Sequence, residues 1–215
     1  MSLIGVNTNF FQDFGSLHIF VTMVFIVWLI IFIYSLKIYG VKKTIRYFLP
    51  ITIVSIIGEL CAIANSGYQY PGYLFYINAF GGSLPVIIGL GWSVNLFICM
   101  HLGKDVATRF FKEKNFKQIF FISVFAGFFG SLLDLLEDPL AYHNNWWIWP
   151  QTADKLYLFD VPLTNFFGWF GIIASMTMLT LLIDRSHYSE NRKVLINITI
   201  PLTLLMLLAP YFYFT

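Results

Sequence analysis

The sequence predicts an all-α fold, a polytopic transmembrane helical bundle of about six spans with both chain ends outside. The sorting of positive charge is the first observation behind this prediction. Of the 13 Lys and Arg residues, all but Lys155 fall into clusters at 37–46, 104–117 and 185–193, between long apolar runs. Short loops rich in Lys and Arg stay on the cytoplasmic side of a membrane. The alternate loops, 66–82 and 137–161, are therefore expected outside.

Composition is the second observation. Of the 215 residues, 58% are hydrophobic and 11% are charged, against about 25% charged in an ordinary soluble domain. Such a chain cannot cover a water-facing surface, so residues 1–215 are expected to form a single integral membrane domain. The net charge of +2 is divided among short loops without a continuous basic stripe. That distribution argues against nucleic acid as a partner and for the lipid bilayer.

The apolar runs are the third observation, because each is close to the ~20 residues that a bilayer core requires. The first, 17–36, is apolar on all sides, and the second, 47–65, carries Glu59 in its outer half. The third run, 83–102, opens at Pro85 and contains Trp92 and Asn95. These are the first three predicted spans.

The second half of the chain supplies three more spans. The run 116–136 is followed by Asp138 and a proline, and the residue before a proline tends to leave a helix. The run 162–183 starts at Pro162, where the missing N–H does no harm. The last run, 194–213, is expected to bend at Pro201. Small residues predict close helix packing on the fourth and fifth spans, namely Gly127, Ser131, Gly168 and Gly171.

The two predicted outer loops are rich in aromatic residues. Loop 66–82 contains Tyr70, and loop 137–161 contains Trp147 within a Trp-Trp-Ile-Trp sequence. Aromatic residues commonly form belts at a membrane interface. Two adjacent loops of this kind can also form a lid over an apolar pocket. Both interpretations are open at this point.

Ionisable and polar groups at membrane depth are costly and therefore usually functional. Glu59 lies about 18 Å from the cytoplasmic end of its span, at 1.5 Å per residue. Asp134 and Asp138 are four residues apart on one helix face. Asp160 and Asn165 flank the start of the fifth span. All lie at a similar depth, so they are expected to converge on one site, although a structural role in capping and bridging helices is the alternative.

Several enzyme classes are disfavoured by what the sequence lacks. The four histidines are isolated, whereas di-iron membrane hydroxylases need clustered ones. A magnesium-dependent prenyltransferase of the membrane type needs two Asp-rich motifs, and this chain has a single Asp-x-x-x-Asp. A Gly-rich phosphate loop, a paired-Cys motif and a nucleophile elbow are absent as well. No metal site is expected.

A series of motifs runs in order through residues 55–175: Gly58-Glu59-Leu60, Leu84-Pro85 before Trp92, Asp134, Asp138-Pro139, Trp147-Ile148-Trp149, and Val161-Pro162-Leu163-Thr164-Asn165-Phe166-Phe167-Gly168-Trp169. In these motifs the chain resembles the bisanhydrobacterioruberin hydratases, the carotenoid 1,2-hydratases of the CruF type. The Pro-Leu-x-Asn-Phe-x-Gly-Trp stretch is the most specific part of the resemblance. The chain is shorter than is usual in that family, and its first outer loop matches loosely.

The resemblance implies addition of water to the terminal 1,2 double bond of an acyclic carotenoid, giving a tertiary alcohol without a cofactor. It also implies a prokaryotic cytoplasmic (inner) membrane location and contact with other carotenoid-pathway enzymes. Protonating an isolated alkene requires an acid that stays protonated near neutral pH, as a carboxyl group among apolar side chains can. The residues expected to act as acid or to position the water are Glu59, Asp134, Asp138 and Asn165.

Aromatic faces near the site are expected to stabilise the resulting tertiary cation by cation–π attraction. The residues expected to bind substrate are Tyr70, Trp92, Trp147, Asp160 and Trp169. Two other functions fit the same features. One is a membrane transferase or lyase acting on another isoprenoid or lipid. The other is a proton-coupled transporter, because acids within a membrane also form proton relays.

Overall fold

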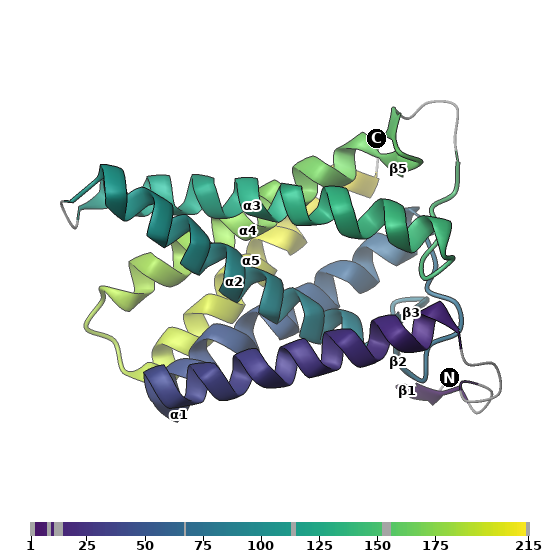
Figure 1. Cartoon of the computed structure of the whole chain (residues 1–215), viewed down its shortest axis with the longest axis horizontal. Helices are drawn as coiled ribbons and strands as arrows, with labels where there is room; N and C mark the ends of the chain where they lie inside the picture. Colours follow the sequence, from purple (N-terminus) through teal and green to yellow (C-terminus); the bar gives the residue numbers. More distant parts are fainter. Residues whose placement is uncertain are drawn as a thin grey trace.

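The computed structural model describes residues 3–7, 10, 15–66, 68–112, 115–151 and 156–213. These residues form five helices that lie alongside one another, with short strands gathered at one end (Figure 1). The helices α1, α2, α3 and α4 are long and apolar enough to cross a membrane. Lys155, the cation predicted in an outer loop, lies outside the described residues.

Helix α1 (Ser16–Ser66) contains both of the first two predicted spans. The two spans are separate helical arms, as expected, but they meet at the single residue Gly40, whose φ of 75° and ψ of 167° are not helical, and the loop expected at 37–46 is otherwise helical. Glycine adopts positive φ at little cost, so one residue is enough for the bend. Figure 1 shows the chain running from the strand-bearing end to the opposite end and back.

The remaining helices follow the predicted runs closely: α2 (Val86–Phe110), α3 (Phe116–His143), α4 (Leu163–Asp184) and α5 (Glu190–Tyr213). Helix α3 extends beyond its predicted end at 136, through Pro139 to His143. The prediction that Asp138 terminates the helix was therefore wrong. Proline removes one backbone N–H from a helix, and α3 continues past this position to His143. As a consequence, Asp134 and Asp138 lie on the same continuous helix.

The outer loops contain short hairpins that the sequence reasoning did not predict. Strands β1 (Ile4–Val6), β2 (Phe75–Ala79) and β3 (Gly82–Pro85) form an antiparallel sheet in the order β1-β2-β3, with Ala79 opposite Gly82. Strands β4 (Tyr157–Leu158) and β5 (Val161–Pro162) form a second hairpin. In both cases the hairpin ends at a proline directly before a helix, α2 or α4.

Close packing fixes α3 between α2 and α4. A Cβ atom on Gly103 would lie 2.5 Å from the carbonyl oxygen of Ile122, and one on Gly127 would lie 2.8 Å from that of Phe170. The predicted packing role of Gly127 is confirmed, and the Ser131 hydroxyl donates to the Phe166 carbonyl at 3.1 Å. The same prediction was wrong for Gly168 and Gly171, which have open space around them.

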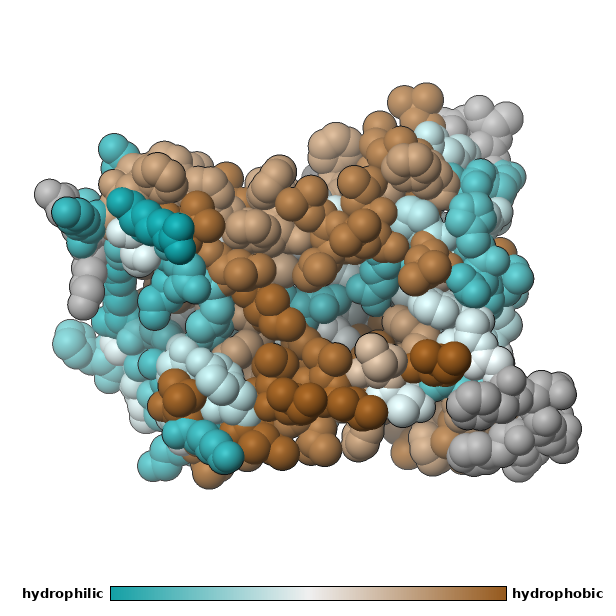
Figure 2. Space-filling model, in the orientation of Figure 1, coloured by the Kyte–Doolittle hydropathy of each residue, from teal (hydrophilic) through white to brown (hydrophobic). Residues whose placement is uncertain are grey.

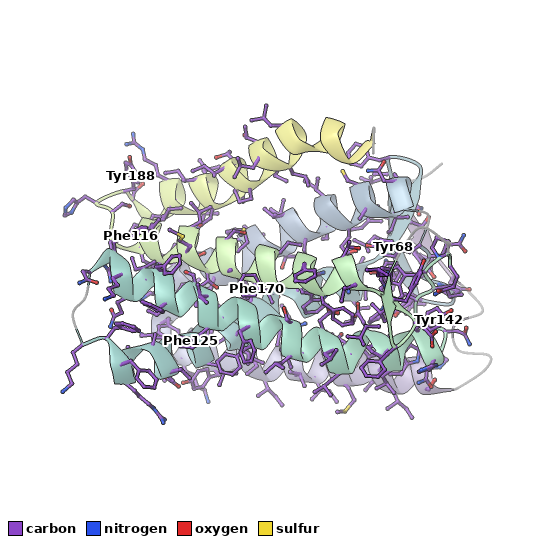
Figure 3. The ribbon with its side chains drawn as sticks, turned by 90° about the horizontal axis from the view of Figure 1, so that it is seen from above. Tyr68, Phe116, Phe125, Tyr142, Phe170 and Tyr188 are labelled. Atoms are coloured by element: carbon purple, nitrogen blue, oxygen red, sulfur yellow. The ribbon has the colours of Figure 1, made fainter. Side chains whose placement is uncertain are left out.

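The surface has the distribution expected of an integral membrane protein. Large apolar side chains are exposed along the first arm of α1 and on the outward faces of α3 and α4. Figure 2 shows an apolar band across the middle of the helices and hydrophilic surface at both ends. Figure 3 places Phe116 and Tyr188 at one end, Tyr68 and Tyr142 at the other, and Phe170 between them. Lipid tails can cover this band without leaving polar backbone unpaired.

Candidate active site

The strand-bearing half of the bundle contains a cavity with an empty volume of about 480 Å³, including its open mouth. Residues of α1, α2, α3 and α4 and of both outer loops line it. Its polar lining consists mainly of carboxyl and amide groups, and its apolar lining is mainly aromatic. The carboxyl and amide residues are Glu59, Asn95, Glu137, Asp138 and Asn165.

Glu59 is held by hydrogen-bond donors on both carboxyl oxygens. The indole Nε1 of Trp92 donates to Oε1 at 2.8 Å. The hydroxyl of Tyr70 donates to Oε2 at 3.3 Å, and the hydroxyl of Tyr68 donates to the same oxygen. A carboxyl group that accepts from three donors is fixed in position and arranged as an ionised carboxylate would be.

Tyr70 acts as a donor because it keeps its proton. Burial, followed by the charge of Glu59, raises the pKa of Tyr70 well above its ordinary value. Tyr70 also packs against Trp147, with ring centroids 5.7 Å apart. Both residues were predicted to bind substrate, and both line the cavity.

Asp134, Asp138 and Asn165 form a second polar group, contributed by α3 and α4. Asp134 is 0% exposed and Asp138 is 2% exposed. The amide Nδ2 of Asn165 donates to Asp134 at 3.0 Å and to Asp138 at 2.5 Å. The two carboxyl groups therefore share one amide donor. Two carboxylates held this close repel each other, which favours a state with a proton on one of the two.

Glu137 and Asn95 complete the polar lining, and the sequence reasoning gave neither of them a role. Glu137 lines the cavity from α3 and Asn95 lines it from α2. Glu137 follows Asp134 by three residues, which places both on the same side of one helix. That spacing was a signal that could have identified Glu137. Within the described residues, no three His, Cys, Asp or Glu side chains are grouped as metal ligands.

Trp92 and Trp169 belong to the aromatic lining of the cavity and contact each other. Their ring centroids are 4.3 Å apart and their planes are tilted by 30°. Each tryptophan ends a Pro-x-x-x-x-x-Gly-Trp sequence, beginning at Pro85 and at Pro162 respectively. In each case a hairpin leads to the proline and the proline leads to a helix. This internal repeat is the sequence signal for the pairing of the two rings.

The two outer loops cover the cavity together. Gln69 and Ile148 form an isolated antiparallel bridge, with backbone N–O distances of 3.0 and 2.9 Å. Beside the bridge, Tyr68 stacks near Trp149 with ring centroids 6.2 Å apart. Trp147 and Trp149 are buried and line the cavity. The loops thus lie over a pocket, as one of the two sequence-based interpretations expected.

Asp160 is a predicted site residue that lies away from the cavity. It lies exposed in the β4–β5 turn with a φ of 64°, and its carbonyl accepts from Gln151 at 3.1 Å. The hairpin reverses the chain between Asp160 and Asn165, so five residues of separation do not place them together. Seven other predicted residues line the cavity: Glu59, Tyr70, Trp92, Asp138, Trp147, Asn165 and Trp169. Asp134 does not line it but accepts a hydrogen bond from Asn165.

The comparison with known families decides the broader identity. A family model described as "Carotenoid biosynthesis protein" matches residues 18–213, which is nearly the whole chain. The chain belongs to this family. No curated protein and no solved structure matches the chain. Membership assigns the chain to carotenoid biosynthesis, and an aromatic cavity within apolar helices suits the hydrophobic compounds of such a pathway.

Proposed function

We propose that this protein is a membrane-embedded hydratase that adds water to the terminal 1,2 double bond of an acyclic carotenoid. The observation that carries the proposal is the arrangement of two separate carboxyl groups around one aromatic cavity. Glu59 on α1 and Asp138 on α3 both line it, with Trp92 and Trp169 also in its wall. Hydration of an alkene requires these elements: an acid, a surface that stabilises a cation, and a base for water.

Asp138 is the proposed proton donor. It lines the cavity and shares the Asn165 donor with Asp134. Repulsion between two carboxylates held this close favours a proton on one of them, and this is the proton that the reaction needs. Transfer of this proton to C2 forms a C–H bond and leaves a tertiary cation at C1. Asn165 donates to both carboxyl groups and so keeps the pair aligned before and after the transfer.

The cation at C1 is proposed to lie against the indole faces of Trp92 and Trp169. An indole face attracts a cation by about 2 kcal/mol or more in a desolvated site. Glu59 is fixed close to Trp92 through their hydrogen bond and supplies negative charge on the same side. Charge that is already oriented when the cation forms stabilises the transition state without reorganisation.

Glu59 is also the proposed base for water. A water molecule attacks C1, forming the C–O bond, and its surplus proton passes to Glu59. Return of a proton from solvent to the Asp134–Asp138 pair, and loss of the proton from Glu59, restore the site. In the net reaction, one alkene and one water molecule give one tertiary alcohol. This reaction involves no oxidation or reduction and requires no cofactor.

The proposed topology places this chemistry in the outer half of the membrane. The two arms of α1 run in opposite directions, and α5 follows α4 across the bundle (Figure 1). We propose that they give six crossings with both ends outside a prokaryotic inner membrane. Under this topology the basic clusters are cytoplasmic, as the charge rule requires.

The experiment that tests the proposal is expression in a lycopene-producing bacterial host, followed by mass spectrometry of the carotenoids. The wild-type chain should produce compounds heavier than lycopene by one water per hydrated end. Glu59→Gln and Asp138→Asn should lower the yield by about 10²- to 10⁴-fold, the usual worth of general acid–base catalysis. Asp105→Asn is the matched control, because Asp105 is exposed and lies outside the cavity.

Two results would count against the proposal. Absence of any water gain with folded wild-type protein would reject the acyclic carotenoid substrate. Wild-type yield from both cavity variants would reject the carboxyl mechanism. An additional Asp160→Asn variant decides the role that the sequence suggested for this exposed residue, since the cavity geometry predicts that it keeps wild-type yield.

A further inference from the structure

A second cavity lies at the opposite end of the bundle from the candidate active site. Its empty volume is about 380 Å³, and residues of α1, α2 and α4 line it. It lies beside the Gly40 bend of α1, since Tyr39 and Lys43 on either side of Gly40 both belong to its lining. The lining also includes Tyr47, His101, Lys104 and Asp184.

The acidic group in this cavity is already neutralised. Arg46, which is 3% exposed, contacts Asp184 at 2.8 Å and Glu190 at 2.6 Å. Lys193 contacts the same Glu190 at 3.6 Å. The second oxygen of Asp184 accepts from the Tyr47 hydroxyl at 3.1 Å. These two cations and two anions balance one another and tie α1, α4 and α5 together.

Lys43 and Lys104 are left as unbalanced positive charges facing the cavity from two helices. Neither forms an ion pair with any described residue. The Lys43 ammonium group lies over the rings of Tyr39 and Tyr47, 5.2 and 5.8 Å from their centroids. Contact with two aromatic faces holds this cation at the cavity wall.

The aromatic wall is itself fixed. The Nδ1 of His101 donates to the carbonyl of Phe97 at 2.7 Å, which leaves Nε2 of the neutral ring as an acceptor. The Tyr39 hydroxyl donates to this Nε2 at 2.7 Å. The Tyr39 ring under Lys43 is therefore held in place by α2. The site is preorganised, with two cations and without an unneutralised anion in its wall.

We propose that this cavity binds a phosphate group. Lysine is a point-charge donor that commonly binds phosphate, and basic pockets between transmembrane helices on the cytoplasmic side bind anionic lipid headgroups. The headgroup of an anionic phospholipid and a free phosphate or diphosphate share this chemistry. Exposed apolar residues Ile38 and Val41 flank the bend and offer a surface for acyl chains. The inference does not depend on the proposed hydratase activity.

The test measures thermal unfolding of the full-length chain by tryptophan fluorescence. The protein is reconstituted in phosphatidylcholine vesicles with or without phosphatidylglycerol, or given inorganic pyrophosphate at constant ionic strength. A ligand that binds the folded state raises the unfolding temperature with concentration. Stabilisation by phosphatidylglycerol identifies a lipid headgroup as the ligand, and stabilisation by pyrophosphate identifies a free phosphate compound.

The variant Lys43→Gln/Lys104→Gln should lose the stabilisation. Each lysine near an anionic headgroup contributes about 1 kcal/mol, so the apparent affinity should fall by roughly 30-fold. The control Lys42→Gln/Lys117→Gln removes the same charge from residues that do not line the cavity and should keep the effect. Lys43→Arg/Lys104→Arg should keep it too, which separates lost charge from poor folding.

Three results would overturn the assignment. The first is that neither phosphatidylglycerol nor pyrophosphate stabilises the wild-type chain. The second is equal loss in the site variant and the control, which would reduce the effect to general surface charge. The third is loss in the arginine variant to the level of the glutamine variant, which would assign these lysines to packing.

Discussion

Replacement of Trp92 by phenylalanine separates two roles that this residue combines in the proposed mechanism. Its ring faces Trp169 at 4.3 Å, and its Nε1 donates to Glu59 at 2.8 Å. Phenylalanine keeps an aromatic face but cannot donate. Trp92→Phe should therefore weaken cation stabilisation in part and remove one of the donors that position Glu59.

The matched variant is Trp169→Phe, which changes the same kind of ring without removing a hydrogen bond to Glu59. A hydrogen bond to a charged group is worth about 1.5–3 kcal/mol. Its loss corresponds to roughly a 10- to 160-fold lower rate. Trp92→Phe should thus be slower than Trp169→Phe by this factor, beyond the loss that both share from a weaker ring face.

The assay is the initial rate of water addition to an acyclic carotenoid, measured on equal amounts of folded protein in vesicles. Trp92→His, which retains a ring N–H, should recover part of the difference if donation to Glu59 is the cause. Equal rates for Trp92→Phe and Trp169→Phe would refute the positioning role of the Trp92–Glu59 hydrogen bond. Cation stabilisation by the ring pair would then account for all of the loss.

Three further predictions follow from the topology, the lid and the packing. A cysteine introduced at Asn144 should react with an impermeant thiol reagent added outside, whereas one at Lys112 should not; the reverse pattern would invert the proposed orientation. Trp147→Phe should retain more activity than Trp147→Leu if this lid residue faces the cation, and equal activities would leave it a packing role. Gly103→Ala should cost about 1–3 kcal/mol because its Cβ would meet the Ile122 carbonyl oxygen at 2.5 Å. Gly168→Ala, which points into open space, should not lower the unfolding temperature, and equal destabilisation of both variants would contradict the packing described for α2 and α3.

The helices could be predicted because length and apolarity are local properties of the sequence. The break at Gly40 could not be predicted, because the same residues are compatible with a short basic loop and with a single glycine at positive φ. The extension of α3 through Pro139 was missed for a related reason. The preference of the residue before a proline is weak compared with the packing of a long helix between two neighbours.

The candidate site was predictable where an ionisable or polar residue lies within an apolar span, because burying such a group costs free energy. Glu59, Asp138 and Asn165 are polar residues in apolar surroundings, and depth along the span brought them to one level. Asp160 precedes the fifth span and was expected at the same membrane depth, but it lies in the two-residue turn between β4 and β5 and away from the cavity. The hydrogen bond from Trp92 to Glu59 depends on how α1 meets α2, and a single sequence contains no record of that contact.

The bridge between Gln69 and Ile148 bears on which product leaves the site. It consists of two backbone hydrogen bonds, each worth about 1 kcal/mol net, so thermal motion can open it readily. In the proposed reaction, a carotenoid end would enter the cavity from the lipid and water would pass these loops. A tertiary cation that meets no water loses a proton instead and becomes an isomeric alkene. Under that proposal, the strength of one small bridge would set the partition between alcohol and isomeric alkene, quite apart from the rate at which the cation forms.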